Sequence, residues 1–336
     1  MTRAPFVSES FEVTKAMTDE WFRGDSARVI AETILSFQTP SGGWSKHVDM
    51  RAAPRKPGQS FFSENESWQY IATIDNGSTT SEMRFLARLD RARPDARWRD
   101  AFVRGLGYLL AAQFPNGGWP QVYPLQGGYH DAVTYNDDAV LEVVRLLGEV
   151  ERGDYAFVPA ADRTRAAAAV QRATGCILAS QVVTDGRRTV WGQQHDPLTL
   201  APTHARSYEL ASLTAKESAG LMRYLMSIPD PDARVVAAVH GAADWFRAHS
   251  ISGYTYDFAT GRHAREGAGP LWARMYELGT DRPIFSNRNG VKLYDYEQLN
   301  DRRLGYAWYT DEPVGALRQY DRWAAKHPRP ASTTRR

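Results

Sequence analysis

Hydrophobic residues recur every three or four positions in several segments of this 336-residue chain, which is the pattern of amphipathic α-helices. The pattern is clearest in four segments: 79–90 (TTSEMRFLARLD), 135–150 (YNDDAVLEVVRLLGEV), 214–226 (TAKESAGLMRYLM) and 232–249 (DARVVAAVHGAADWFRAH). Segments in which apolar and polar residues alternate, as they do in a half-buried strand, are scarce. The periodicity therefore predicts a helical protein.

A second pattern repeats along the chain, in which a helical run ends in Gln and is followed by a turn and a Trp. The three copies pair Gln38 with Trp44, Gln113 with Trp119, and Gln181 with Trp191. The first two copies share a Gly-Gly pair. Gly accepts the positive φ angles of turns that end helices, so the pair marks the end of a helix. Helix pairs that repeat about every 70 residues, joined by long loops, predict an all-α toroid whose loops gather at one end. An open helical solenoid is the alternative, but it would repeat more regularly.

Two segments have the composition of loops or disordered ends, at 51–60 (RAAPRKPGQS) and at 327–336 (HPRPASTTRR). We expect the second to be a disordered tail. From about Leu271 the sequence becomes irregular, aromatic and rich in Arg, and Gly and Pro interrupt every possible long helix. Neither loop divides the chain, so we predict one domain over residues 16–326, preceded by an N-terminal extension of residues 1–15.

Composition and charge narrow the classes of partner. The formal net charge is +2, so no strong overall field favours nucleic acid or a membrane surface. Ten Trp and sixteen Tyr indicate a broad aromatic surface of the kind that binds sugars. Cys176 is the only cysteine, which excludes an intramolecular disulfide and indicates a buried thiol. No apolar run is long enough to span a membrane, and the first residues lack the apolar stretch of a secretion signal.

Acidic residues stand just before two of the predicted helices. They are Asp75 in TIDNGST, and Asp137 and Asp138, which follow Asn136 in YNDDAV. Each group has an ordinary structural interpretation, as a turn-forming residue or a helix N-cap. Each also has a functional one, because loop carboxylates are the hard oxygen ligands that calcium requires. Asp75 and Asp137 occupy equivalent places in the repeat, which makes them candidates to converge on one metal ion, although their spacing lacks the EF-hand pattern.

A long stretch without helical periodicity starts at Trp191 and contains His195, Asp196, His204, Arg206 and Glu209. Long polar loops in compact domains are more often functional than idle, because ordering them costs entropy without adding to a core. A zinc site built from the two His residues is supported neither by a His-x-x-x-His spacing nor by a Cys cluster.

Five blocks of sequence together resemble the family 10 polysaccharide lyases, which are pectate lyases: TIDNGSTTSEMRFLARL, QFPNGGWPQVYPL, YNDDAV, QHDPLTLAPTHARSYEL and LWARMYELGTDRPIFSNRNG. The similarity runs from about residue 16 to residue 325. It implies an all-α, incomplete (α/α)3 toroid that binds polygalacturonate in a groove at one end, with calcium as cofactor. It also implies a secreted or periplasmic protein, although no signal peptide is visible in this chain, and we expect a monomer.

The resemblance assigns roles to five residues. Asp75 and Asp137 match the family's calcium-binding aspartates, Arg206 matches its proposed catalytic base, and Arg274 and Arg288 resemble the arginines that bind substrate carboxylates. In β-elimination the C5 proton next to a uronate carboxylate is removed and the C4 oxygen is expelled. Calcium and arginine suit this reaction because both stabilise charge that builds up on the carboxylate. A guanidinium ordinarily stays protonated, so Arg206 needs neighbouring cations to act as a base.

Two other function classes remain open. Gln and Trp repeats with acidic motifs also occur in toroidal isoprenoid cyclases, although arginines suit a carbocation poorly. A non-catalytic glycan-binding protein would use the same aromatic surface without a base. Tyr306, Trp308 and Tyr309 are candidates to stack on sugar faces. Of the other candidates, Trp44 and Trp119 are interpreted as packing residues, and Arg302 and Arg303 as part of a solvated or ion-paired surface.

Overall fold

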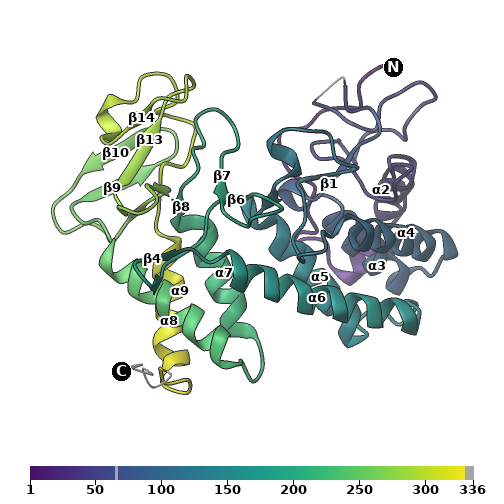
Figure 1. The fold of residues 1–336 in the computed structure, drawn as a ribbon. Coiled ribbons are helices and arrows are strands. Elements are labelled where there is room, and N and C mark those ends of the chain that lie inside the picture. Colours follow the sequence, from purple (N-terminus) through teal and green to yellow (C-terminus); the bar gives the residue numbers. More distant parts are fainter. Residues whose placement is uncertain (65–66, 330–336) are drawn as a thin grey trace. The chain divides into compact units, whose positions relative to one another are not determined.

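The computed structural model describes residues 1–64 and 67–329 of the chain (Figure 1). It contains two compact units, Met1–Ala173 and Thr174–Arg336. The boundary falls within helix α6 (Ala160–Ser180). The predicted single domain over residues 16–326 stays a prediction, because compactness alone does not show whether the units fold separately.

Unit 1 is built on helices whose apolar faces meet. They are α1 (Asp19–Arg23), α2 (Asp25–Ser36), α3 (Thr80–Ala92), α4 (Ala96–Ala112), α5 (Ala139–Arg152) and the first part of α6. Helix α3 packs against α1, α2, α4 and α5. The rings of Phe22 and Phe85, both fully buried, lie 5.1 Å apart where α1 meets α3. Aromatic pairs of this kind contribute both buried area and a preferred geometry to the core.

Short strands and 3-10 turns connect the helices of unit 1. They are β1 (Ala72–Thr73), β2 (Val122–Tyr123), β3 (Val133–Thr134), η1 (Asp75–Gly77), η2 (Tyr129–Asp131) and η3 (Asn136–Asp138). Strands β1 and β2 are antiparallel, with Ala72 opposite Tyr123. The turns η1 and η3 lie side by side, and they stand just before α3 and α5. The acidic segments singled out in the sequence are therefore neighbours.

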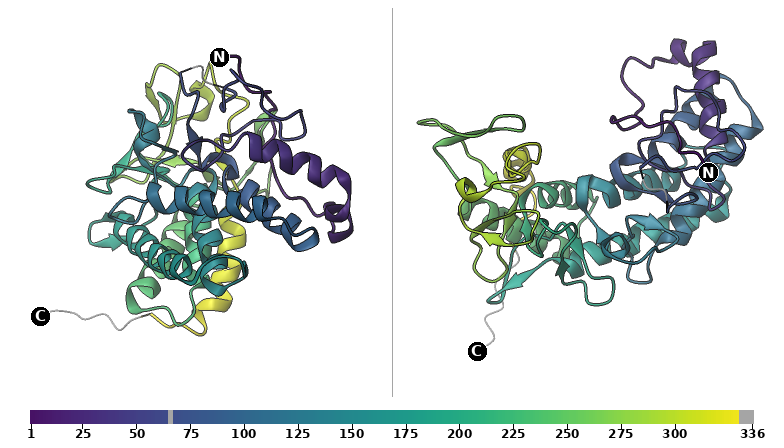
Figure 2. Two further views of the ribbon diagram at one scale, coloured as in Figure 1. Left: turned by 90° about the vertical axis from the view of Figure 1, so that its right-hand side faces the viewer. Right: turned by 90° about the horizontal axis from the view of Figure 1, so that it is seen from above.

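In unit 2 the helices α7 (Ala215–Ser227), α8 (Ala233–Ala248) and α9 (Glu312–Ala324) pack against one another (Figures 1 and 2). The strands of this unit are β4 (Val183–Thr184), β5 (Arg187–Arg188), β6 (Gln194–His195), β7 (Pro202–Thr203), β8 (Leu213–Thr214), β9 (Tyr254–Asp257), β10 (Gly261–Ala264), β11 (Trp272–Ala273), β12 (Met275–Tyr276), β13 (Pro283–Ser286), β14 (Lys292–Leu293) and β15 (Tyr309–Thr310). One antiparallel sheet has the order β14-β13-β12-β8. The pairs β4 with β5, β6 with β7, β9 with β10, and β11 with β15 are also antiparallel. A 3-10 turn, η4 (Tyr296–Gln298), follows β14.

The predicted all-α fold class is wrong. The structure is 42% helix and 13% strand and contains several small sheets, so it is a mixed fold, and the predicted incomplete (α/α)3 toroid is not confirmed. The strands are only two to four residues long. A strand of two residues is too short to show the alternation by which a strand is recognised in a sequence. The helices expected at 79–90, 135–150, 214–226 and 232–249 are present as α3, α5, α7 and α8.

The Gln and Trp repeat is a structural motif, which confirms that its Trp residues are packing residues. Each Gln donates from Nε2 to one carbonyl in the turn that follows and to another on a later helix: Gln38 to Gly42 and Ala101, Gln113 to Gly117 and Ala169, and Gln181 to Thr189 and Ala238. Each Trp is fully buried and donates from Nε1 to a carbonyl of the preceding helix: Trp44 to Ile34, Trp119 to Leu109, and Trp191 to Ile177. The Trp bonds reach carbonyls in the last turn of each helix, where intrahelical donors run out.

Both predicted end segments contact the folded units where they are described. In the extension of residues 1–15, Ala4 and Phe11 are buried, and Phe6 forms a β-bridge with Val48. Of the predicted disordered tail 327–336, positions 330–336 lie outside the described residues, while Arg329 pairs with Asp244 on α8 at 2.6 Å. No helix in the described part of the chain is long and apolar enough to span a bilayer.

Candidate functional site

Asp75 and Asp137 lie on the two neighbouring turns of unit 1, η1 and η3. The second residue of each turn has a positive φ, 52° at Asn76 and 48° at Asp137. Among residues other than Gly, Asn and Asp tolerate this left-handed conformation best. Asp137 is therefore equivalent to Asn76, and the expected equivalence of Asp75 with Asp137 was wrong by one position.

Asp75 is buried and forms an ion pair with Lys46. The Lys46 ammonium lies 2.8 Å from Asp75 Oδ2 and 3.4 Å from Glu64 Oε2. Burial by itself would lower the pKa of Lys46, but the two carboxylates outweigh it and raise this pKa. The other carboxylate oxygen, Asp75 Oδ1, is buried and finds no hydrogen-bond partner among the described residues.

A cavity of about 300 Å³ opens beside Lys46, and we call it the Lys46 pocket. Its lining includes Lys46, Glu64, Trp68, Asp75, Gln121 and His130. Ligand pockets typically combine aromatic walls with a few placed polar groups. The Lys46 pocket has this composition, and Asp75 is one of its polar groups.

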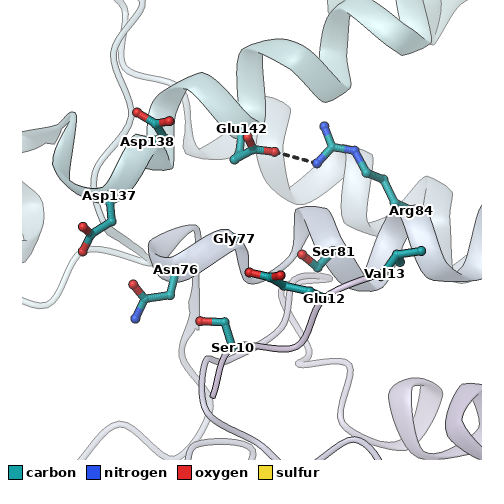
Figure 3. A pocket seen from close by; sticks show the side chains of 10 residues that line it. All are labelled: Ser10, Glu12, Val13, Asn76, Gly77, Ser81, Arg84, Asp137, Asp138 and Glu142. Carbon is teal, nitrogen blue, oxygen red and sulfur yellow. Dashed lines mark hydrogen bonds and ion pairs between the residues drawn. The ribbon is translucent and has the colours of Figure 1, made fainter. Parts of the chain in front are cut away.

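Asp137 lines a different cavity of about 550 Å³, shown in Figure 3, which we call the acidic cavity. Its other acidic residues are Glu12, Asp138 and Glu142, and Asn76 presents its amide at the same opening. Arg84 enters from α3 and pairs with Glu142 at 2.7 Å. The carboxylates outnumber this cation, so the acidic cavity favours a cationic ligand.

The two predicted calcium ligands, Asp75 and Asp137, meet only part of what the ion requires. Calcium binds about six to eight hard oxygen atoms. Within residues 1–64 and 67–329, no group of three or more His, Cys, Asp or Glu side chains is arranged to hold a metal ion by itself. Asp137 in the acidic cavity and Asp75 Oδ1, which lacks a hydrogen-bond partner in the described chain, are both suitable oxygen ligands. The two carboxylates line different cavities, so the structure does not bring them together into one calcium site, and each would need further oxygens from water or substrate.

In unit 2, Arg206 forms a two-point ion pair with Glu209. Its Nε and Nη2 atoms each lie 2.7 Å from a different oxygen of the Glu209 carboxylate. Glu209 is buried, whereas 45% of the Arg206 side chain is exposed. Burial would lower the pKa of Arg206, but the hydrogen bonds and charge of Glu209 outweigh it and raise this pKa. In this conformation Arg206 is held firmly as a cation.

Glu209 also connects Arg206 to Arg274 through Tyr306. The Tyr306 hydroxyl donates to Glu209 Oε1 at 3.0 Å, and the Arg274 guanidinium lies 4.8 Å from the centre of the Tyr306 ring. Arg274 is buried and pairs with Glu217 at 2.7 Å. Burial raises the pKa of Tyr306, which keeps its hydroxyl protonated as a donor. Arg274 thus contributes positive charge from beneath the surface.

Arg288 is exposed and lies near Arg206, because Ser207 donates from Oγ to the Arg288 carbonyl at 2.6 Å. Asp301 accepts a hydrogen bond from the Arg288 backbone nitrogen. Arg302, which we interpreted as part of the surface, lies with its guanidinium 5.2 Å from the Tyr208 ring centre. Arg206 and Arg274 are therefore linked through Glu209 and Tyr306, whereas Arg288 is joined to the same segment through its backbone.

His195 has a structural role. Its Nε2 atom accepts a hydrogen bond from the Gly192 backbone at 3.0 Å, and Nδ1 lies 2.8 Å from the Leu200 carbonyl. Burial lowers its pKa to about 4, so the ring stays neutral. These bonds occupy both ring nitrogens, whereas a zinc ligand needs one of them for the metal.

Sequence reasoning did not identify Lys46 or Gln121. It considered Tyr306 only as an aromatic that could stack on a sugar, and it named Glu209 only as part of a long loop. The spacing of three residues between Arg206 and Glu209 is a usable signal for an ion pair. Tyr306 is 97 residues from Glu209 along the chain, so no local pattern could have linked the two.

Known proteins with a similar sequence or structure help to interpret this geometry. The model of a family described as pectic acid lyase matches residues 38–316. The solved structure of a family 10 polysaccharide lyase from Cellvibrio cellulosa is similar, with a TM-score of 0.79 and 33% sequence identity over 94% of this chain and 98% of that chain. A mutant of a family 10 polysaccharide lyase from Cellvibrio cellulosa, in complex with trigalaturonic acid, gives a TM-score of 0.78 and 32% identity over 94% of this chain and 99% of that chain. No curated protein sequence matches this chain.

Proposed function

Because the chain belongs to the pectic acid lyase family, we propose that it is a pectate lyase that cleaves α-1,4-linked polygalacturonate by β-elimination. The products would be 4,5-unsaturated oligogalacturonides. The observation that carries the proposal is the link from Arg206 through Glu209 and Tyr306 to Arg274 in unit 2, with the exposed Arg288 joined to the neighbouring Ser207 through its backbone. These arginines suit a substrate with a carboxylate on every sugar. The structure of a similar lyase with bound trigalaturonic acid supports the same substrate class.

The roles of the arginines differ with their exposure to solvent. Arg288 is exposed and can contact a substrate carboxylate directly, with two parallel hydrogen bonds. Arg274 is buried against Glu217, so its contribution in this conformation is electrostatic. Both would stabilise the negative charge that develops on the carboxylate when the C5 proton leaves.

We assign removal of that proton to Arg206. Its pair with Glu209 works against this role, because a guanidinium held by a carboxylate gives up its proton less readily. The nearby cationic Arg274 works in the opposite direction. Deprotonation of Arg206 then requires high pH, so the activity is expected to rise steeply on the alkaline side.

In unit 1, Asp137 and Asp75 would hold the calcium ion, which would supply withdrawal of charge from a substrate carboxylate. Lys46 fixes the Asp75 carboxylate by binding its Oδ2 atom, which leaves Oδ1 for a ligand. A monomeric state and a secreted or periplasmic location remain predictions of the sequence analysis.

The test follows the ultraviolet absorbance of the unsaturated product after the protein is added to polygalacturonate at alkaline pH, with calcium or with excess chelator. We expect calcium-dependent growth of the absorbance. Arg206→Ala should abolish that growth, whereas Arg234→Ala, a control at an arginine of the same unit that is 74% exposed, should not. Binding of polygalacturonate by the unaltered protein without any absorbance change would instead favour a non-catalytic glycan-binding protein. Family membership removes the reason for the isoprenoid cyclase alternative.

A further inference from the structure

Gln121 lines the Lys46 pocket and carries a buried hydrogen-bond acceptor. Its backbone is fixed on both sides, since its nitrogen donates to the His130 carbonyl at 2.8 Å and its carbonyl accepts from Thr73 Oγ1 at 2.6 Å. The residue is 7% exposed, and its Oε1 atom has no hydrogen-bond partner in the part of the chain that the structure describes. A buried acceptor without a donor costs free energy, so the pocket favours a ligand that supplies one.

The aromatic residues of the Lys46 pocket contact one another. Trp68 meets the ring of His130 edge to face at 4.5 Å, and His130 stacks on Tyr129 at 3.7 Å. Phe62 packs against the other side of Trp68 at 5.6 Å. Rings that hold one another in place lose little entropy when a ligand binds. A cavity of about 300 Å³ with such a wall lies at the lower end of small-ligand pockets, which suits a single sugar ring.

The charges of the Lys46 pocket indicate which side of a sugar it accepts. Lys46 is paired with both Asp75 and Glu64, so one cation faces two carboxylates. Without calcium, a ligand carboxylate placed here would meet net negative charge, whereas a hydroxyl group would meet acceptors. The metal-free pocket therefore favours the hydroxyl face of a sugar over its carboxylate, and the Gln121 acceptor calls for a hydroxyl donor whether or not calcium is bound.

We propose that the Lys46 pocket is a subsite that binds the hydroxyl face of one galacturonate residue, with Gln121 Oε1 accepting a hydrogen bond from a ring hydroxyl. This inference rests on the proposed function, because it takes the substrate to be polygalacturonate. It adds a specificity determinant that the arginines of unit 2 do not provide. A sugar acetylated on that hydroxyl has no proton to donate and would leave Gln121 Oε1 without a partner.

The test compares Gln121→Leu, which removes the acceptor at similar size, with Gln171→Leu, the same change at an exposed position of α6. Initial rates are measured on polygalacturonate and on the same polymer after chemical O-acetylation, and calorimetry measures trigalacturonate binding in excess chelator. Loss of one neutral hydrogen bond should raise KM and weaken binding by about fivefold to tenfold, with kcat nearly unchanged. We expect the unaltered protein to prefer the unacetylated polymer and Gln121→Leu to lose that preference. Gln171→Leu should match the unaltered protein.

The outcomes separate this inference from the proposed function. Cleavage of polygalacturonate with equal KM and equal acetyl preference in Gln121→Leu and the unaltered protein would overturn the subsite and leave the lyase intact. If the unaltered protein neither cleaves polygalacturonate nor binds trigalacturonate, both proposals fail. If Gln121→Leu melts well below Gln171→Leu, Trp68→Leu at the partly exposed wall replaces it, with the same rise in KM expected and an unchanged KM counting against the subsite.

Discussion

The Arg206 guanidinium engages both oxygens of the buried Glu209 carboxylate, each at 2.7 Å. The backbone nitrogen of Arg206 and the Tyr306 hydroxyl donate to the same carboxylate. Burial would raise the pKa of Glu209, but Arg206 outweighs it and lowers this pKa. The two charges stabilise each other, and this is the main obstacle to Arg206 as a base.

Replacing Glu209 by Gln should make the neutral form of Arg206, which is the form that can take a proton, more abundant. The substitution removes the negative charge that raises the Arg206 pKa, so the neutral guanidine forms at lower pH. Each unit by which this pKa falls increases the neutral fraction about tenfold. We expect the alkaline rise of kcat on polygalacturonate to move to lower pH by about one unit or more.

Glu149→Gln is a matched control, because Glu149 holds Arg84 and accepts from the Tyr155 hydroxyl in the same way. Its pH profile should keep its position. A fall of kcat in Glu209→Gln by the same factor at every pH would mean that Glu209 only positions Arg206, and it would contradict the electrostatic explanation.

Glu82, buried on α3, should make the protein less stable at alkaline pH. Burial raises its pKa to about 8, against the opposing backbone N–H groups of Glu82 and Thr79. Between about pH 4.5 and pH 8 the folded protein therefore keeps a proton that the unfolded chain releases. Stability falls as pH rises through this window, by at most about 5 kcal/mol. Glu82→Gln removes this dependence, because a neutral amide resembles the protonated acid.

Thermal unfolding measured from pH 5 to pH 9 checks this expectation. The Tm of Glu82→Gln minus that of the unaltered protein should be small at pH 5 and largest above pH 8. Glu151→Gln, the same change at an exposed position of α5, should give a constant difference. A constant difference for Glu82→Gln as well would show that Glu82 is already ionised in the folded protein at pH 5.

The helices could be predicted from the sequence because each spans several turns of apolar periodicity. Helix α5, with Val140, Val143, Val144 and Leu147 buried, is a clear example. The strands could not, because pairs such as Ala72–Thr73 with Val122–Tyr123 are set by where the connecting segments meet in space. These short strands make the fold mixed, whereas periodicity alone indicates a helical protein.

Residues of the candidate site could be predicted only where the neighbouring sequence carries a recognisable signal. Arg206, Asp75 and Asp137 stand in recognisable sequence blocks. The partners of these residues come from distant positions, as Lys46 does for Asp75, 29 residues away. The turn conformation that makes Asp137 equivalent to Asn76 depends on backbone angles, which neighbouring Asn and Asp residues leave ambiguous by one position.

The Gln and Trp motif provides the last prediction, at Gly117. This residue has φ of +96°, and a Cβ atom placed on it would lie 2.1 Å from the Arg172 carbonyl oxygen on α6. Gly117→Ala must therefore shift the turn away from α6 and strain the bonds that Gln113 makes to Gly117 and Ala169. We expect a loss of more than about 1 kcal/mol of unfolding free energy.

Gly107→Ala is the control for this substitution, because Gly107 lies in α4 and a Cβ atom placed on it would have no heavy atom of the described chain within 4 Å. It should stabilise the protein by about 0.5–1 kcal/mol, since Ala loses less conformational freedom in a helix than Gly does. Chemical denaturation of both variants measures these changes. Equal stability of the two would show that the turn does not need Gly117.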